Sequence, residues 1–150
     1  MTATASVSAE CTLIDLPALL ALWSEPFPAG ADGEFALRQF YADPCVINGK
    51  ATTIADLAAG VRALQGALSA PSRSLLSCLE ANQKVVFAFE LQGRHTGPLR
   101  TSVGVIAATG ADLRLRIIDI LTIADGVVTD VIMVADELGA LAAAGAVAAS

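Results

Sequence analysis

The stretch that decides the fold is residues 112–136, DLRLRIIDILTIADGVVTDVIMVAD. Its Asp125-Gly126 dipeptide lies between two runs rich in β-forming residues, and this combination is the strongest short-range signal for a β-hairpin. Polar and apolar residues alternate from Asp112 onward, which predicts a strand with one face turned toward a core. We therefore predict a long strand over 112–123, a tight turn, and a return strand over 127–134.

The flanking sequence extends this pattern in both directions. Two further strand-like runs, Ser72–Glu80 and Lys84–His95, lie on either side of a turn at 81–83 and are rich in Val and Phe. Residues 96–101 form a Gly- and Pro-containing stretch, which predicts a loop. Beyond the hairpin, Asp136 opens an Ala-rich segment that predicts a short terminal helix.

The first half of the chain is helical in character. Apolar residues predict a short helix over 16–23, a second over about 33–41, and a third that starts at Thr53. In this third helix Asp56 completes an approximate capping box, and Pro71 marks the end. A short strand, residues 45–47, and an Asn48-Gly49 turn lie between the last two helices.

Helices followed by an antiparallel meander indicate an α+β fold. We expect a cone-shaped α+β barrel in which three N-terminal helices pack on a strongly curved antiparallel sheet, with a short C-terminal helix. Residues 1–10 are rich in small residues and are expected to be a disordered leader. Residues 11–150 are expected to form a single domain, which fits the usual length of one domain.

Composition excludes several classes of function. Hydrophobic residues make up 55% of the chain and charged residues 16%, so there is more apolar surface than an ordinary monomer needs. No apolar run approaches the roughly 20 residues of a membrane span, and the N-terminus lacks the features of a signal peptide, so we expect a cytoplasmic protein. A net charge of −6 with scattered basic residues argues against nucleic acid as a partner. We expect an apolar small-molecule substrate and a homodimer or higher homo-oligomer.

The three cysteines, Cys11, Cys45 and Cys78, show no CxxC spacing. We interpret them as small buried hydrophobes in a reducing compartment, with neither a disulfide nor a zinc site. The chain has one histidine, and no phosphate-binding or dinucleotide-binding fingerprint is present. These observations predict no metal and no cofactor.

Four segments of the second half resemble the SnoaL-like polyketide cyclase family. They are Gly93-Arg94-His95-Thr96-Gly97-Pro98-Leu99, the Thr109-Gly110 turn, the strand and hairpin from Asp119 to Gly126, and the closing piece from Asp130 to Gly145. Their order and spacing cover about residues 84–145. This resemblance implies the nuclear-transport-factor-two-like fold and a cofactor-independent enzyme of secondary metabolism, such as antibiotic biosynthesis, that closes rings by intramolecular aldol chemistry. The same superfamily contains epoxide hydrolases, ketosteroid isomerases and non-catalytic binding modules, and these remain alternatives.

Asp136 is the first candidate catalytic residue. The resemblance places it at the catalytic Asp of the cyclases, and a carboxylate at the mouth of an apolar pocket has a raised pKa that suits acid–base catalysis. A side chain here also suits the N-cap of the last helix. The sequence leaves both roles open.

Asp119 and His95 are the other candidate catalytic residues. Strand alternation places Asp119 on the same face as Leu115, Ile117 and Leu121, and an inward Asp must be paired, protonated or catalytic. His95 lies between Gly93 and Gly97, where the backbone can approach a ligand closely. It is either a group that polarises a substrate carbonyl or a surface or hydrogen-bonded residue.

Aromatic and aliphatic residues complete the predicted pocket. We expect it to be bounded by the second and third helices and the concave face of the sheet. Epoxide opening would require Asp119, Asp136 and Arg94 to reach one water. The predicted substrate-binding residues are Trp23, Phe40, Tyr41, Phe87, Phe89, Thr122 and Ile132.

Overall fold

The computed structural model describes residues 11–147. The predicted leader, residues 1–10, lies outside the described residues. The elements run in the order α1 (Leu16–Ser24), α2 (Ala31–Arg38), β1 (Tyr41–Ile47), β2 (Lys50–Thr52), α3 (Ile54–Ala67), β3 (Leu68–Ala81), β4 (Lys84–His95), β5 (Leu99–Thr101), β6 (Gly104–Ile106), β7 (Asp112–Ala124), β8 (Val127–Ala135) and α4 (Glu137–Ala143).

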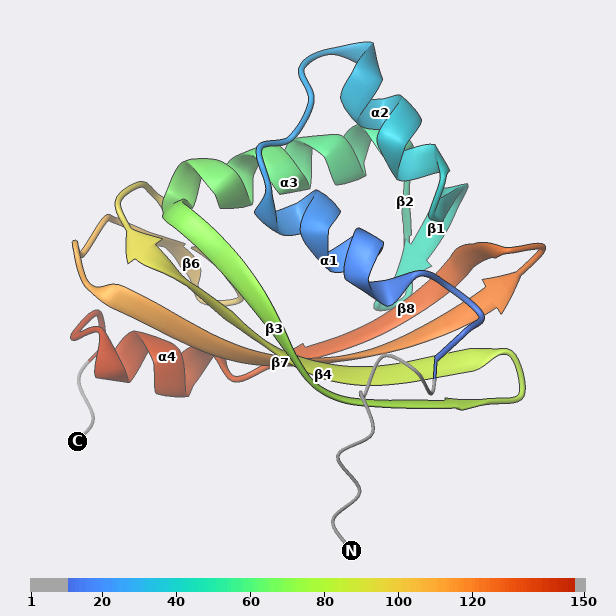
Figure 1. Ribbon diagram of the computed structural model, residues 1–150. Coiled ribbons are helices and arrows are strands. Elements are labelled where there is room, and N and C mark those ends of the chain that lie inside the picture. Colours follow the sequence, from blue (N-terminus) through green and yellow to red (C-terminus); the bar gives the residue numbers. More distant parts are fainter. Residues whose placement is uncertain (1–10, 148–150) are drawn as a thin grey trace, which may run out of the picture.

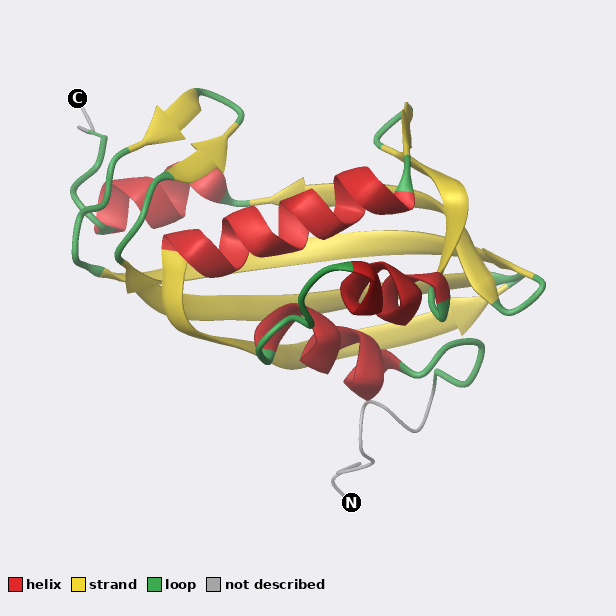
Figure 2. Cartoon of the chain, turned by 90° about the horizontal axis from the view of Figure 1, so that it is seen from above, coloured by secondary structure: helices red, strands yellow, loops and turns green. Residues whose placement is uncertain are grey.

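The main sheet has the strand order β2-β1-β8-β7-β4-β3, and β5 and β6 form a separate hairpin. Three N-terminal helices cover one face of the main sheet, as predicted, and α4 lies near one end (Figure 1, Figure 2). The sheet is mixed and not purely antiparallel, because β1 pairs with β8 in parallel. It is also open, since β2 and β3 are edge strands and the strands within residues 11–147 do not close into a barrel. The predicted strong curvature is not confirmed.

The β7–β8 hairpin confirms the prediction from the Asp125-Gly126 turn. Asp125 and Gly126 have φ values of 52° and 80°, as a two-residue primed turn requires. Alternation along β7 buries Leu113, Ile117 and Leu121 beneath the helices. The register of β7 therefore determines which of its polar residues face the interior.

Two segments differ from the predictions. The second helix ends at Arg38, so Tyr41 begins a strand where the apolar pattern predicted a helix. Tyr41 pairs with Val128 of β8, and the local apolar pattern does not reveal this contact with a distant part of the chain. The predicted loop over residues 96–101 instead contains β5, which pairs with β6.

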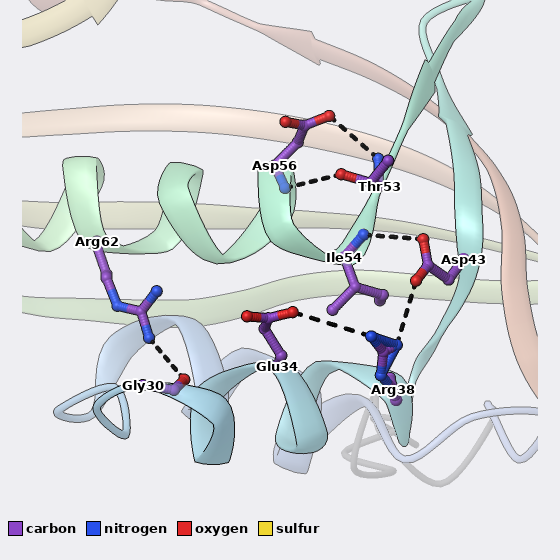
Figure 3. A network of polar contacts seen from close by, with 8 residues as sticks. All are labelled: Gly30, Glu34, Arg38, Asp43, Thr53, Ile54, Asp56 and Arg62. Carbon is purple, nitrogen blue, oxygen red and sulfur yellow. Dashed lines mark hydrogen bonds and ion pairs between the residues drawn. The ribbon is translucent and has the colours of Figure 1, made fainter.

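A polar network joins α2, β1 and α3 (Figure 3). Thr53 and Asp56 form the predicted capping box at the start of α3, each side chain accepting the other's backbone N–H. Asp43 accepts the backbone N–H of Ile54 at 3.1 Å and pairs with Arg38 at 3.2 Å. This network fixes the start of β1 against two helices, and Tyr41 lies two residues before Asp43.

The cysteines differ from the prediction. Cys11 and Cys78 form a disulfide that ties the segment before α1 to the edge strand β3, while Cys45 is a buried free thiol. The prediction of three unpaired thiols is therefore wrong for two of them. Pairing across 67 residues depends on the tertiary fold, which no local spacing reveals.

Candidate functional site

The interior between the helices and the sheet contains a cavity of about 130 Å³, which we call the inner cavity. Its apolar wall comes from α1, α3 and the central strands, including Leu19, Leu57, Phe87, Phe89 and Leu121. The bounding helices are α1 and α3, so the prediction of the second and third helices is wrong for α2. Four polar or amphipathic side chains face this apolar space: Trp23, Tyr41, Arg73 and Asp119.

Asp119 is the acidic residue of the inner cavity. It shares a face of β7 with Ile117 and Leu121, as the alternation predicted, and the structure shows that this face is the inward one. Its Oδ1 atom is fully enclosed and has no hydrogen-bond partner among the described residues. Burial raises the pKa of the Asp119 carboxyl to about 6 from an ordinary value of 3.8, and the charge of Arg73 opposes that rise. A carboxyl with this pKa exchanges a proton near neutral pH.

Tyr41 provides a hydroxyl group whose proton is free for a ligand. The indole Nε1 of Trp23 donates to the Tyr41 hydroxyl oxygen at 3.1 Å. That oxygen still carries its own hydrogen, which finds no acceptor among the described residues. Burial raises the pKa of Tyr41 well above its ordinary value, the Trp23 hydrogen bond opposes this, and the nearby Asp119 charge adds to it. The hydroxyl therefore stays protonated and can donate.

Arg73 on β3 is the functional candidate that the sequence did not reveal. Its guanidinium lies 5.0 Å from the ring centroid of Trp23 and 5.0 Å from that of Phe89. It makes no hydrogen bond or ion pair with the described residues, and its Nε is enclosed without a partner. Burial lowers the pKa of Arg73 to about 10, so the group still carries its charge at neutral pH. A desolvated cation held between aromatic rings is suited to meet an oxygen anion.

A second cavity of about 210 Å³, the outer cavity, adjoins the first. It lies between β5, β7, α4 and the end of α3, and its wall is mostly aliphatic, including Leu64, Leu99 and Leu113. Trp23, Arg73, Ile117 and Met133 line both cavities, so these four side chains form the boundary between them.

Asp136 does not line either cavity. Its side chain is exposed, and Oδ1 accepts the backbone N–H of Gly139 at 3.0 Å, which makes Asp136 the N-cap of α4. The capping role that the sequence left open is therefore present. A solvent-exposed carboxylate outside the cavities lacks the apolar surroundings on which its catalytic prediction rested.

His95 is fully buried but also lies outside both cavities. Its Nδ1 accepts the backbone N–H of Thr109 at 3.3 Å and lies 3.0 Å from the Thr109 hydroxyl. Gly97 approaches the backbone of α3 and not a ligand, because a Cβ there would overlap the carbonyl oxygen of Gly66. The segment around His95 thus anchors the β5–β6 hairpin to the main sheet.

The structure brings together four of the seven predicted substrate-binding residues. Trp23, Tyr41, Phe87 and Phe89 line the inner cavity. The other three do not line it: Phe40 packs against the core from outside, Thr122 accepts a hydrogen bond from Lys84 at 2.8 Å, and Ile132 is exposed on the opposite face of the sheet.

Metal and membrane features complete the description. Within residues 11–147 no group of three His, Cys, Asp or Glu side chains is arranged to hold a metal ion. No helix in the same range is both long and apolar enough to cross a bilayer.

Comparisons with known proteins agree with this architecture. Residues 31–144 match the SnoaL-like polyketide cyclase family. TsrD from Streptomyces laurentii aligns with a TM-score of 0.74 and 22% identity over 88% of this chain and 92% of TsrD. A protein from Jannaschia sp. CCS1 assigned to the SnoaL-like polyketide cyclases aligns with a TM-score of 0.69 and 16% identity over 99% and 100%. A protein of ketosteroid isomerase-like fold from Catenulispora acidiphila aligns with a TM-score of 0.65 and 13% identity over 87% and 91%. No curated protein matches the chain.

Proposed function

The chain belongs to the SnoaL-like polyketide cyclase family, and from this premise we propose that it is a cofactor-independent acid–base enzyme that acts on an enolisable carbonyl compound. The reaction that we propose is ring closure of a mostly apolar polycarbonyl substrate by intramolecular aldol addition, in secondary metabolism. The observation that carries the proposal is the Asp119 carboxyl, which is held in an apolar cavity with a free oxygen and a pKa of about 6.

Asp119 is the base in the first step. Its carboxylate removes a proton from the carbon next to a substrate carbonyl, so that the C–H electron pair moves into the new C=C bond and negative charge develops on the carbonyl oxygen. Tyr41 donates its hydroxyl proton as a hydrogen bond to that oxygen, and the Arg73 guanidinium lies in the same cavity. Donors placed before the reaction stabilise such charge strongly in a water-poor site.

The second step closes the ring. The enolate carbon attacks a second carbonyl carbon of the same molecule, which forms a C–C bond and leaves negative charge on the second oxygen. Protonated Asp119 returns its proton to that oxygen, which gives a hydroxyl group and restores the carboxylate. The cavity wall contributes by holding the flexible substrate in a folded shape, which removes entropy before the reaction.

This proposal gives the acid–base role to Asp119 and not to Asp136. Epoxide opening has less support, because Asp136 and Arg94 do not line the cavity with Asp119. Double-bond isomerisation would use the same three groups, Asp119, Tyr41 and Arg73, and differs only in where the proton returns. A non-catalytic binding module would use the cavity but would gain nothing from a proton-exchanging carboxyl.

Proton exchange at carbon tests the first step without knowledge of the natural substrate. The probe is 2-tetralone in D₂O, with loss of its α-proton signal followed by NMR. We expect the protein to accelerate exchange over buffer, and Asp119→Asn to lower the accelerated rate by roughly 10²–10⁴-fold. Asp136→Asn is the matched control, because Asn caps a helix about as well as Asp, and it should keep the full rate. Loss of exchange in the Asp136 variant with retention in the Asp119 variant would overturn the assignment.

A further inference from the structure

The two cavities are each too small for a substrate of several rings. An apolar cavity of roughly 150 Å³ holds one benzene molecule. The inner cavity, at about 130 Å³, therefore accommodates about one six-membered ring, and the outer cavity, at about 210 Å³, holds one ring or a short hydrocarbon chain. A larger ligand must occupy both cavities and pass the four side chains between them.

Arg73 is the polar group at this passage. The rings of Trp23 and Phe89 fix its position, because each ring centroid lies 5.0 Å from the guanidinium. A guanidinium donates hydrogen bonds only in its own plane. Because Arg73 lines both cavities and has no partner among residues 11–147, its donors remain for a ligand oxygen. The other three boundary residues, Trp23, Ile117 and Met133, offer mainly apolar contact.

The outer cavity is suited to hydrocarbon beyond that oxygen. Its inner wall is formed by leucines and alanines of β4, β5, β7, β8 and α4, such as Leu91, Leu115 and Ala135. The acidic residue at its edge, Glu137, is already occupied, since it accepts hydrogen bonds from the backbone N–H of Ser102 at 3.0 Å and from the Ser102 hydroxyl. Among the described residues no buried polar side chain of this wall calls for an oxygen on the tail, and Arg100, which also lines the cavity, is exposed to solvent.

We propose that the ligand is an elongated polyketone with a hydrocarbon tail, in which the ring-forming end with both reacting carbonyl groups lies in the inner cavity, one carbonyl oxygen lies at Arg73, and the tail fills the outer cavity. This inference deepens the proposed function and rests on it for the reactivity of the carbonyl. It adds the substrate class and assigns Arg73 to recognition of the oxygen at the junction of the two cavities.

Binding of two alkyl phenyl ketones tests the tail cavity. Acetophenone and hexanophenone share a ring and a carbonyl but differ by four methylenes, and each fully buried methylene strengthens binding roughly fourfold. Four fully buried methylenes would give roughly 250-fold. For a tail that is only partly enclosed we expect hexanophenone to bind the wild-type protein about 10- to 100-fold more tightly, by calorimetry and by fluorescence of Trp23, the sole tryptophan of the chain. Equal affinities for the two ketones would overturn the inference.

Two variants show where the tail binds. Ala135→Leu adds bulk to the outer cavity alone, so it should reduce the ratio of the two affinities to about one and leave acetophenone binding unchanged. Ala55→Leu, at an exposed position on α3 that lines neither cavity, is the matched control and should keep the wild-type ratio. An Ala135→Leu protein that weakens both ketones equally, or that keeps the ratio, contradicts a tail in the outer cavity.

Arg73 and Asp119 variants separate this inference from the proposed function. Arg73→Lys keeps the charge and loses the planar fork, so it should weaken both ketones by the same factor, about 10-fold, and keep their ratio. Asp119→Asn should keep the ratio while losing α-proton exchange. A wild-type protein with the expected ratio but no exchange would refute the catalytic proposal alone, whereas exchange without any effect of tail length would refute the tail cavity alone.

Discussion

Asp119→Asn should stabilise the protein at neutral pH. The pKa of Asp119 is about 6 in the folded chain against 3.8 ordinarily, a rise of about 2 units, and each unit corresponds to about 1.4 kcal/mol. Holding this carboxylate ionised therefore costs the folded state about 3 kcal/mol at pH 8. Asn has nearly the same shape and no charge. The variant also deprives Arg73 of a nearby anion, so we expect a net gain of about 1–3 kcal/mol.

The pH dependence gives this prediction a sign that can be checked. Below the pKa of the unfolded chain the Asp119 carboxyl is protonated in both states, so it does not destabilise the folded protein. As pH rises through the folded pKa, the carboxyl has to ionise inside the cavity, and stability is lost. The two proteins should therefore be about equally stable near pH 3.5. The advantage of the variant should grow between about pH 4 and pH 6 and stay constant above pH 7. Urea denaturation of both proteins at these pH values measures the difference, and a variant less stable than wild type at pH 8 would refute the reasoning.

Three further predictions concern assembly and stability. The face of the sheet away from the helices exposes apolar residues, among them Val134, so we expect a homodimer through this face, and Val134→Glu should give a monomer in light scattering at micromolar concentration where wild type does not. Reducing the Cys11–Cys78 disulfide should lower the free energy of unfolding by about 2–4 kcal/mol, and an unchanged denaturation midpoint in dithiothreitol would contradict a structural role. Gly97→Ala should lose about 1–3 kcal/mol, because the added Cβ overlaps the carbonyl oxygen of Gly66, whereas the same change at Gly60, where a Cβ meets open space, should not destabilise.

Local signals explain what the sequence could predict. The Asp125-Gly126 turn requires a conformation that few dipeptides adopt, so the β7–β8 hairpin followed from it directly. That Asp119 shares a face with Ile117 and Leu121 followed from strict alternation, because a strand has only two faces, and the structure shows that this face is the inward one. The capping box at Thr53 likewise marked the start of α3.

Tertiary packing explains what the sequence could not predict. Arg73 lies in a run that is exposed at several positions, and its burial depends on Trp23 and Phe89, which come from two other elements. An acidic residue just before a helix can act as its N-cap or as a catalytic group, and the sequence does not distinguish these roles. The position of α4 in the fold places Asp136 outside the cavities. The distinction between cavity and core required the arrangement of all these elements in space.

The pH profile of α-proton exchange tests the central claim most directly, because it reports the pKa of the base in the free protein. With 2-tetralone as the probe, kcat/KM for exchange in the wild-type protein should rise tenfold per pH unit at low pH and level off above a pKa of about 6, the value for the Asp119 carboxyl. The Asp119→Asn protein should show a low rate without this inflection. An inflection near pH 6 that persists in the Asp119→Asn protein would show that another group is the base and would contradict the account.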